Sequence, residues 1–205
     1  MTEYTKKLIS AIILAGGQSS RMGQDKALLP MGSNTLLTHV CNIAKECAKS
    51  VYVVTPWTKK YQSKLPVECQ LVRERLVLPQ QKSNSPLIGF AQGMFQVTTP
   101  WILLLACDLP QLNSSQVKQW SKYLTTVLPG EIALLPRHAK GWEPLCGFYR
   151  RSCLPLLEAY INRGGKSFQG FLAQYPVREL VISDRNCLFN CNTPEDWQKI
   201  INGGE

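Results

Sequence analysis

Apolar residues in this chain gather in short runs, and polar, charged or glycine-bearing segments separate them. The runs are rich in aliphatic side chains and too short to be lone buried helices, which is typical of strands covered on both faces. The run at residues 101–107, WILLLAC, is the most apolar and is expected at the centre of the sheet. The predicted strands span residues 11–15, 51–55, 69–73, 101–107, 132–136 and 143–149.

Apolar residues three and four positions apart predict helices between these strands. Asn34 or Thr35 can cap the first helix, and Pro86 suits the first position of the second, where its missing N–H costs nothing. A short strand near residue 188 is expected before a last helix, which Thr193 caps. The other predicted helices span residues 35–48, 86–96, 117–127, 154–161 and 168–173.

The alternation of strand, helix and strand predicts right-handed parallel crossovers. We therefore expect a Rossmann-like α/β fold with three layers and a mostly parallel sheet. The length of 205 residues suits a single domain, spanning residues 1–205, with one sizeable core. Residues 76–85 are polar without periodicity and are expected to form a mobile loop beside the ligand-binding edge of the sheet.

The sharpest break in the hydrophobic pattern comes at Gly16 and Gly17, after the apolar run at residues 11–15. Glycine N–H groups can approach an anion closely, and Arg21 and Lys26 add positive charge, so the segment predicts a phosphate-binding loop. Its spacing matches neither the Walker loop nor the dinucleotide fingerprint. The alternative is a glycine-rich turn that only ends a strand. A second basic turn at residues 163–167 is either another phosphate site or a solvated loop.

Asp108 follows the most apolar predicted strand directly, and Pro110 stiffens the turn after it. Taken alone, such an aspartate is best interpreted as a turn or helix-cap residue. Beside a phosphate loop the interpretation changes, because Mg²⁺ binds one or two carboxylates together with phosphate oxygens. The sequence therefore predicts a magnesium ligand at Asp108.

The charge balance points to phosphorylated small molecules or an acidic partner. The net charge is +9, from 23 Lys and Arg against 14 Asp and Glu. These basic residues are scattered, and no basic run is interleaved with aromatic residues as a single-strand binding surface requires. We therefore expect no nucleic-acid partner.

Several features predict a cytoplasmic protein without a membrane partner. No apolar run approaches the length of a membrane span, and the N-terminal segment lacks the apolar core of a signal peptide. The eight cysteines contain no C-x-x-C pair and are interpreted as free, small hydrophobic side chains in a reducing compartment. Cys187 and Cys191 lack a second pair, so a zinc site is not expected.

Residues 14–26 resemble the signature loop of the sugar-phosphate pyrophosphorylase type of nucleotidyltransferase, LAGG-x-S-x-R-M-G-x-D-K, at every fixed position. The segments CDLP at 107–110 and N-x-N-T-P-E-D at 190–196 follow in the same order. Together with the short chain, these motifs resemble the molybdenum cofactor guanylyltransferases. The first motif alone also fits sugar-1-phosphate and cytidylyl transferases, and a nucleotide-binding protein without turnover is a further alternative.

The resemblance implies a nucleotidyltransferase fold and Mg²⁺-dependent transfer of GMP from GTP to the terminal phosphate of molybdopterin, with release of pyrophosphate. Transient protein partners would be molybdoenzymes or proteins that deliver the cofactor. The resemblance assigns nucleotide binding to Leu14, Ala15, Gly16, Gly17, Lys26, Glu74 and Asp108. It assigns catalysis to Arg21, Lys26 and Asp108, the metal to Asp108 and Asn192, and the pterin to Asn190 and Asn192.

The chain departs from the family pattern at three places. Glu74 is longer than the aspartate usual at its position, and Thr55 stands near the place of an expected asparagine. These two departures leave the choice between guanine and cytosine open, although the phosphate chemistry is unaffected. Ser85 replaces the leading glycine of a G-P-L-x-G segment.

Overall fold

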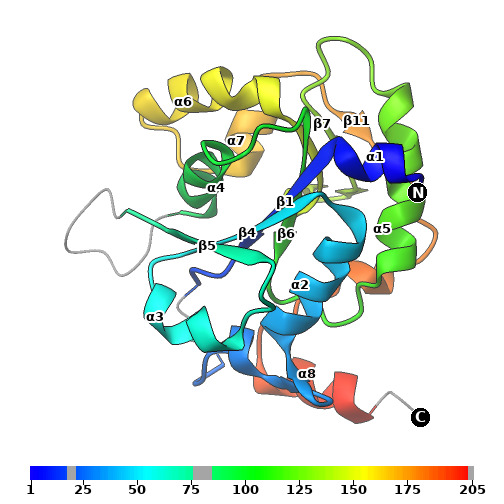
Figure 1. The fold of residues 1–205 in the computed structure, drawn as a ribbon. Helices are drawn as coiled ribbons and strands as arrows, with labels where there is room; N and C mark the ends of the chain where they lie inside the picture. Colours follow the sequence, from blue (N-terminus) through cyan, green and yellow to red (C-terminus); the bar gives the residue numbers. More distant parts are fainter. Residues whose placement is uncertain (18–21, 76–84, 203–205) are drawn as a thin grey trace.

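The computed structural model describes residues 1–17, 22–75 and 85–202, and its main feature is a seven-stranded sheet (Figure 1). The strand order is β11-β7-β10-β6-β1-β4-β5. Strand β1 pairs in parallel with β4 and β6, β4 with β5, and β7 with β11, whereas β10 is antiparallel to both its neighbours. The predicted mostly parallel sheet is confirmed. The strands are β1 (Ile9–Leu14), β4 (Ser50–Thr55), β5 (Cys69–Arg73), β6 (Trp101–Ala106), β7 (Ala133–Leu135), β10 (Cys146–Arg150) and β11 (Arg178–Glu179).

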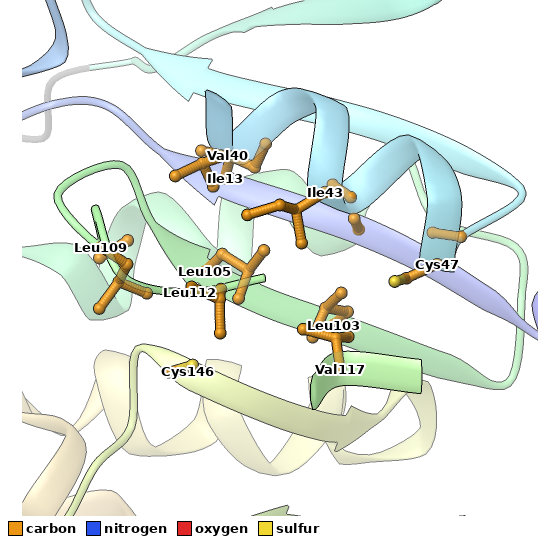
Figure 2. Close-up of a cluster of buried hydrophobic side chains, with 14 of the residues drawn as sticks. Ile13, Val40, Ile43, Cys47, Leu103, Leu105, Leu109, Leu112, Val117 and Cys146 are labelled. Atoms are coloured by element: carbon orange, nitrogen blue, oxygen red, sulfur yellow. The ribbon is translucent and has the colours of Figure 1, made fainter. Parts of the chain in front are cut away.

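The apolar runs form central strands, and apolar side chains pack against both faces of these strands. Every residue of β6 is buried, and successive side chains of β1 enter opposite apolar clusters. Ile13 packs in the cluster under α2 (Leu36–Cys47) and α5 (Ser114–Trp120), which Figure 2 shows with Val40, Leu105 and Val117. Ile12 packs in the other cluster, under α4 (Pro86–Met94), α6 (Leu154–Asn162) and α7 (Phe168–Leu172).

Helices therefore lie on both faces of the sheet, and the predicted three-layer arrangement is confirmed (Figure 1). Thr35 caps α2 by accepting a hydrogen bond from the Thr38 N–H at 3.2 Å, as the sequence predicted. None of the described helices is both long and apolar enough to cross a membrane. The short elements are α1 (Glu3–Lys7), η1 (Lys26–Leu28), β2 (Pro30–Met31), β3 (Asn34–Thr35), α3 (Thr58–Tyr61), η2 (Gln62–Lys64), η3 (Ser121–Thr126), β8 (Arg137–His138), β9 (Gly141–Trp142), η4 (Arg151–Cys153) and η5 (Arg185–Leu188). The last helix is α8 (Pro194–Asn202).

Three predicted elements differ in the structure. The predicted strand near residue 188 is wrong: Leu188 ends the short 3-10 helix η5, in which the Asn186 N–H donates to the Asp184 side chain, and residues 189–193 form no strand. The helix predicted at 117–127 begins at Ser114 and becomes 3-10 after Trp120, because Asn113 and Gln116 form a capping box that starts it early. The strand predicted from 143 begins at Cys146, after a proline that has no N–H for pairing. The loop predicted at 76–85 lies outside the described residues, apart from Ser85.

The strand order places a crevice between β1 and β6. The chain runs outward from β1 to β4 and β5, then returns through α4 to add β6 on the other side of β1. Leu14 is in register with Ala106, and the Cys107 N–H donates to the Leu14 carbonyl at 3.3 Å. Such a switch in strand order is where open parallel α/β sheets bind ligands. The two strands predicted to carry the site are therefore neighbours.

Candidate active site

A cavity of about 280 Å³ lies at the carboxyl ends of β1, β4 and β6, and we call it the central cavity. Its volume is near the lower end of the range typical of small-molecule sites, roughly 300–1,000 Å³. All the residues predicted to bind the nucleotide line it. They are Leu14, Ala15, Gly16, Gly17, Lys26, Glu74 and Asp108. The structure brings these residues together, and their binding role stays a prediction.

The Asp25 side chain holds the start of η1 in place. Its carboxylate accepts from the Ala27 N–H at 3.0 Å, which begins η1, and from the Tyr61 hydroxyl at 2.7 Å. Lys60 also forms an ion pair with it. These contacts fix the first turn of η1 and so aim Lys26 toward the cavity. Arg21, with the rest of residues 18–21, lies outside the described part of the chain.

Lys26 joins three segments that are far apart in sequence. Its ammonium donates to the Asn192 Oδ1 at 2.7 Å and lies 3.4 Å from the Asp108 Oδ2. Both charged side chains are largely enclosed, with 13% of Lys26 and 19% of Asp108 exposed. Low solvent access strengthens charge interactions and leaves less water to compete for the group that binds there. We call these three residues the Lys26 cluster.

Burial raises the pKa of the Asp108 carboxyl above its usual range, and the neighbouring Lys26 ammonium opposes that shift. Desolvation disfavours the charged form of a carboxyl, whereas a cation close by favours it. Any positive charge brought near Asp108 therefore stabilises the ionised form of this enclosed carboxyl. That is the behaviour expected of a metal ligand, although an ion pair in a structural role would show it too.

The C-terminal motif has a structural explanation that also places Asn192. The Asp196 carboxylate accepts from the N–H groups of Asn192 and Thr193, both at 2.9 Å, and these donors lower its pKa. Thr193 caps α8 by accepting from the Asp196 N–H at 3.2 Å. The Cys191 N–H donates to the Asp108 carbonyl at 3.1 Å, which ties this segment to the end of β6.

The two predicted asparagines behave differently. The Asn192 side chain enters the Lys26 cluster, and its amide also donates to the Asn190 carbonyl at 3.4 Å. The Asn190 amide instead donates to the Leu188 carbonyl of its own loop at 3.3 Å. Among the described residues, the structure thus links Asn192, but not Asn190, to Lys26 by a hydrogen bond.

Glu74 follows β5 and is 6% exposed. Its N–H donates to the Thr55 carbonyl at 2.9 Å, which holds its backbone beside the end of β4. A Cβ added to Gly16 would lie 2.9 Å from the Glu74 Oε2, and one added to Gly89 would lie 3.5 Å from the Oε1. The carboxylate therefore lies between the loop after β1 and helix α4, at a place that needs a glycine at Gly16.

Thr55, a second departure from the family pattern, is fully buried. Its hydroxyl accepts a hydrogen bond from the Trp57 N–H at 3.1 Å, which shapes the turn after β4. The cavity wall at this strand is made by Val54 instead. The threonine is thus accounted for by the turn, whereas the other two departures, Glu74 and Ser85, line the central cavity.

The residues present fit a magnesium ion held together with a phosphorylated substrate. The Asp108 carboxylate and the Asn192 amide supply hard oxygen donors within reach of the same ammonium group. Within the described ranges, no group of three or more His, Cys, Asp or Glu side chains could hold a metal alone. A site with one carboxylate suits Mg²⁺ when substrate phosphates complete its coordination.

Sequence reasoning missed Tyr61 and Gly89, which also line the central cavity. Tyr61 belongs to a four-residue helix with no periodic signal, and its role depends on a hydroxyl that reaches Asp25. Gly89 sits inside a helix, where a glycine is unfavourable and can indicate a close neighbour. Glu74 is the nearest neighbour, but a Cβ at Gly89 would lie 3.5 Å from its Oε1, which is an ordinary contact distance.

A glycine-bearing loop, an enclosed lysine and a carboxylate at the switch point define an α/β protein that binds a phosphorylated ligand. A family model described as the MobA-like NTP transferase domain matches residues 11–178, and the chain belongs to that family. A probable molybdenum cofactor guanylyltransferase of Trichormus variabilis is 52% identical over 188 residues, covering 92% of this chain and 88% of the relative. The resemblance stated from the motifs is confirmed.

Solved structures agree with the fold. Molybdopterin-guanine dinucleotide biosynthesis protein A from Archaeoglobus fulgidus superposes with a TM-score of 0.76 at 20% identity, covering 96% of this chain and all of that one, 100%. Rv0371c of Mycobacterium tuberculosis, crystallised in complex with manganese, gives a TM-score of 0.64 at 16% identity, covering 96% of this chain and 99% of that one. At these identities the likeness shows a shared nucleotidyltransferase fold.

Proposed function

We propose that this chain transfers GMP from GTP to the terminal phosphate of molybdopterin and releases pyrophosphate. One observation carries the proposal: Gly16, Lys26 and Asp108, which come from two separate motifs, line a single cavity at the switch point of the sheet. The naming of relatives at 52% identity as molybdenum cofactor guanylyltransferases supports GTP and molybdopterin as the substrates.

The reaction needs positioning and charge neutralisation more than covalent participation by the protein. The terminal phosphate of molybdopterin attacks the α-phosphorus of GTP in line, the bond between the α-phosphorus and the bridging oxygen breaks, and pyrophosphate leaves. The attacking phosphate is already ionised near neutral pH, so no general base is required. Lys26 and, outside the described residues, Arg21 neutralise the leaving pyrophosphate.

The residues that end β1 and β6 orient the nucleotide. The backbone N–H groups of Gly16 and Gly17 approach the phosphates, because neither residue carries a side chain in the way. Asp108 and Asn192 would hold Mg²⁺, which when bound would supply positive charge to the triphosphate and the attacking phosphate. Asn192 and Asn190, beside this cluster, are proposed to contact the pterin phosphate.

Glu74 is proposed to recognise guanine. A carboxylate only accepts hydrogen bonds, and guanine offers it two neighbouring donors, N1–H and the 2-amino group. Cytosine presents a ring-nitrogen acceptor beside its amino group, which a carboxylate would repel. The position of the Glu74 carboxylate between Gly16 and Gly89 thus favours guanine over cytosine.

The cellular setting is proposed from general properties of the chain. We propose that residues 1–205 form one nucleotidyltransferase domain, because every described strand of the large sheet except β11 contributes side chains to the same two apolar clusters. Eight free cysteines fit a reducing cytoplasm. Molybdoenzymes or cofactor-delivery proteins are the protein partners we propose, on the grounds of the product alone.

Pyrophosphate release tests the proposed function against its alternatives. The purified chain is mixed with Mg²⁺, one nucleotide (GTP, CTP or ATP) and one acceptor (molybdopterin or a sugar 1-phosphate). We expect release with GTP and molybdopterin only. Preference for CTP or for the sugar acceptor would favour a different transferase of this fold, and binding of GTP without release would favour a non-catalytic protein.

Replacing Gly16 with alanine is expected to weaken GTP binding by about tenfold or more and to leave stability nearly unchanged. The new Cβ would meet the Glu74 Oε2 at 2.9 Å, so the carboxylate must move away from the position proposed for guanine. Its flexible end can move without disturbing the core, and the loss of a hydrogen bond to a charged group is worth roughly 1.5–3 kcal/mol. Titration of GTP by calorimetry and a thermal melt of the same sample measure both effects.

Gly17→Ala is the matched comparison for Gly16→Ala. A Cβ at Gly17 meets nothing within 4 Å, so its effect on GTP affinity is expected to be clearly smaller. Equal losses in the two variants would mean that the backbone of the loop, and not the Glu74 carboxylate, explains the effect at Gly16.

A further inference from the structure

Ser85 occupies the N-cap of α4 without acting as a side-chain cap. A serine at this position usually accepts a hydrogen bond from an N–H in the first turn. Here the Ser85 carbonyl accepts hydrogen bonds from the N–H groups of Ile88 at 3.0 Å and Gly89 at 3.2 Å. The Ser85 side chain makes no capping hydrogen bond. The Ser85 hydroxyl oxygen is buried and has no hydrogen-bond partner among the residues that the structure describes.

A buried hydroxyl without a partner costs stability, so its retention needs a reason. Ser85 belongs to the wall of the central cavity, together with Glu74 and Gly89. Because no hydrogen bond to a described residue holds the hydroxyl, rotation about the side-chain bond can direct it to a ligand without breaking such a bond. The residue thus keeps a spare donor at the wall of the binding cavity.

Ser85 and the Glu74 carboxylate both lie next to Gly89. The Gly89 N–H donates to the Ser85 carbonyl at 3.2 Å, and a Cβ added to Gly89 would lie 3.5 Å from the Glu74 Oε1. Both side chains therefore belong to the part of the cavity wall around Gly89. The first turn of α4 also presents the positive end of a helix dipole, which favours an electronegative ligand atom.

We propose that the Ser85 hydroxyl donates a hydrogen bond to the O6 carbonyl of guanine and is a specificity-determining contact of this cavity. The inference rests on the proposed function, in which Glu74 accepts from N1–H and the 2-amino group. O6 is the next atom along that edge of guanine and needs a donor. Serine and glutamate together complement the donor, donor, acceptor order of guanine, which neither adenine nor cytosine presents.

The test compares GTP with two analogues that each lose one of these contacts. In 6-thio-GTP the oxygen at position 6 is replaced by sulfur, a weak acceptor, whereas ITP keeps O6 and lacks the 2-amino group. We expect Ser85→Ala and Ser85→Gly to weaken GTP binding about threefold to tenfold, the worth of one neutral hydrogen bond. The affinity of both variants for 6-thio-GTP should change little relative to the unmodified chain. Their affinity for ITP should fall by the same factor as their affinity for GTP.

The thermal midpoint separates this role from a structural one. If Ser85 caps α4, Ser85→Ala should lower the midpoint, as the loss of an N-cap does. If its hydroxyl is a spare donor, the midpoint of the free protein should stay level or rise. Ser121→Ala is the matched control, because the Ser121 hydroxyl is buried but donates to the Lys118 carbonyl at 2.9 Å, away from the cavity. We expect it to leave GTP binding unchanged.

Two results would overturn the proposal in different ways. If Ser85→Ala weakens the binding of GTP and of 6-thio-GTP equally, or weakens neither, Ser85 does not contact O6. The proposed function is unaffected by that result, provided that the unmodified chain binds GTP. Failure of the unmodified chain to prefer GTP over CTP and ATP would instead overturn the proposed function on which the inference rests.

Discussion

Lys26→Ala is expected to reduce guanylyl transfer by ~10²-fold or more while the chain still folds. The Lys26 ammonium is the described cation that reaches both Asp108 and Asn192, and it lines the central cavity. Without it, charge that builds on the leaving pyrophosphate is less well neutralised, so the barrier rises. Initial rates of pyrophosphate release, at saturating GTP and Mg²⁺, measure the effect.

The same change is expected to have a modest effect on stability. Lys26 opposes the rise in the pKa of Asp108, so its loss leaves an enclosed carboxylate with less compensation. The pair is partly screened by solvent, and the free energy of unfolding should fall by about 1 kcal/mol, or roughly 2–4 °C in the thermal midpoint. The double variant Lys26→Ala/Asp108→Asn should recover that midpoint without recovering activity.

Lys118→Ala provides the control for Lys26→Ala. Lys118 also pairs with a carboxylate, Glu46, but on the exposed side of α5. Loss of Lys118 should leave the fold intact, since exposed ion pairs contribute little to stability. The rate of transfer should therefore be unchanged. A folded Lys26→Ala protein that transfers GMP at the unmodified rate would show that Lys26 has no part in the reaction.

The sequence was sufficient to pair the two halves of the site because both follow parallel strands. Lys26 and Asp108 each come after an apolar run, and the carboxyl ends of neighbouring parallel strands meet at one edge. Neighbouring central places for β1 and β6 agree with the apolar character of both strands, which Ser10 interrupts only in β1. The short strand β11 carries only two paired residues, too few to leave a periodic signal.

The C-terminal contribution was only partly predictable. Asn190 and Asn192 alternate in a motif, and spacing gives no sign that only the second reaches Lys26. That difference comes from tertiary contacts: the Cys191 N–H is anchored on the Asp108 carbonyl, and Asp196 holds the Asn192 N–H. The sequence predicts a strand near residue 188 because a short apolar stretch carries no period that separates strand from turn. In the structure, capping by Asp184 starts the 3-10 helix η5, which ends at Leu188.

Asp108→Asn is expected to reduce transfer by at least ~10²-fold without lowering stability. Asparagine keeps the shape of the side chain and the backbone contact with Cys191, but it removes the charge that Mg²⁺ requires. Raising Mg²⁺ should recover the rate only in part, because an amide oxygen is a weaker ligand than a carboxylate. A Mg²⁺ titration of pyrophosphate release measures both the loss and the incomplete recovery.

The stability of Asp108→Asn has a defined dependence on pH. Burial raises the pKa of Asp108 in the folded chain, so the ionised carboxylate costs stability at pH values above that pKa. Asparagine removes this cost, and the thermal midpoint of the variant should equal or exceed that of the unmodified chain at neutral pH. The difference should shrink as the pH falls and Asp108 becomes protonated.

Asp184→Asn shows what a purely structural aspartate does under the same substitution. The Asp184 side chain caps η5 by accepting from the Asn186 N–H at 2.9 Å, and asparagine caps about as well, so activity and midpoint should both be kept. If Asp108 were likewise only a turn residue, its asparagine variant would behave in the same way. A stable, fully active Asp108→Asn protein would therefore place the metal site elsewhere and leave Lys26 as the charge that serves the reaction.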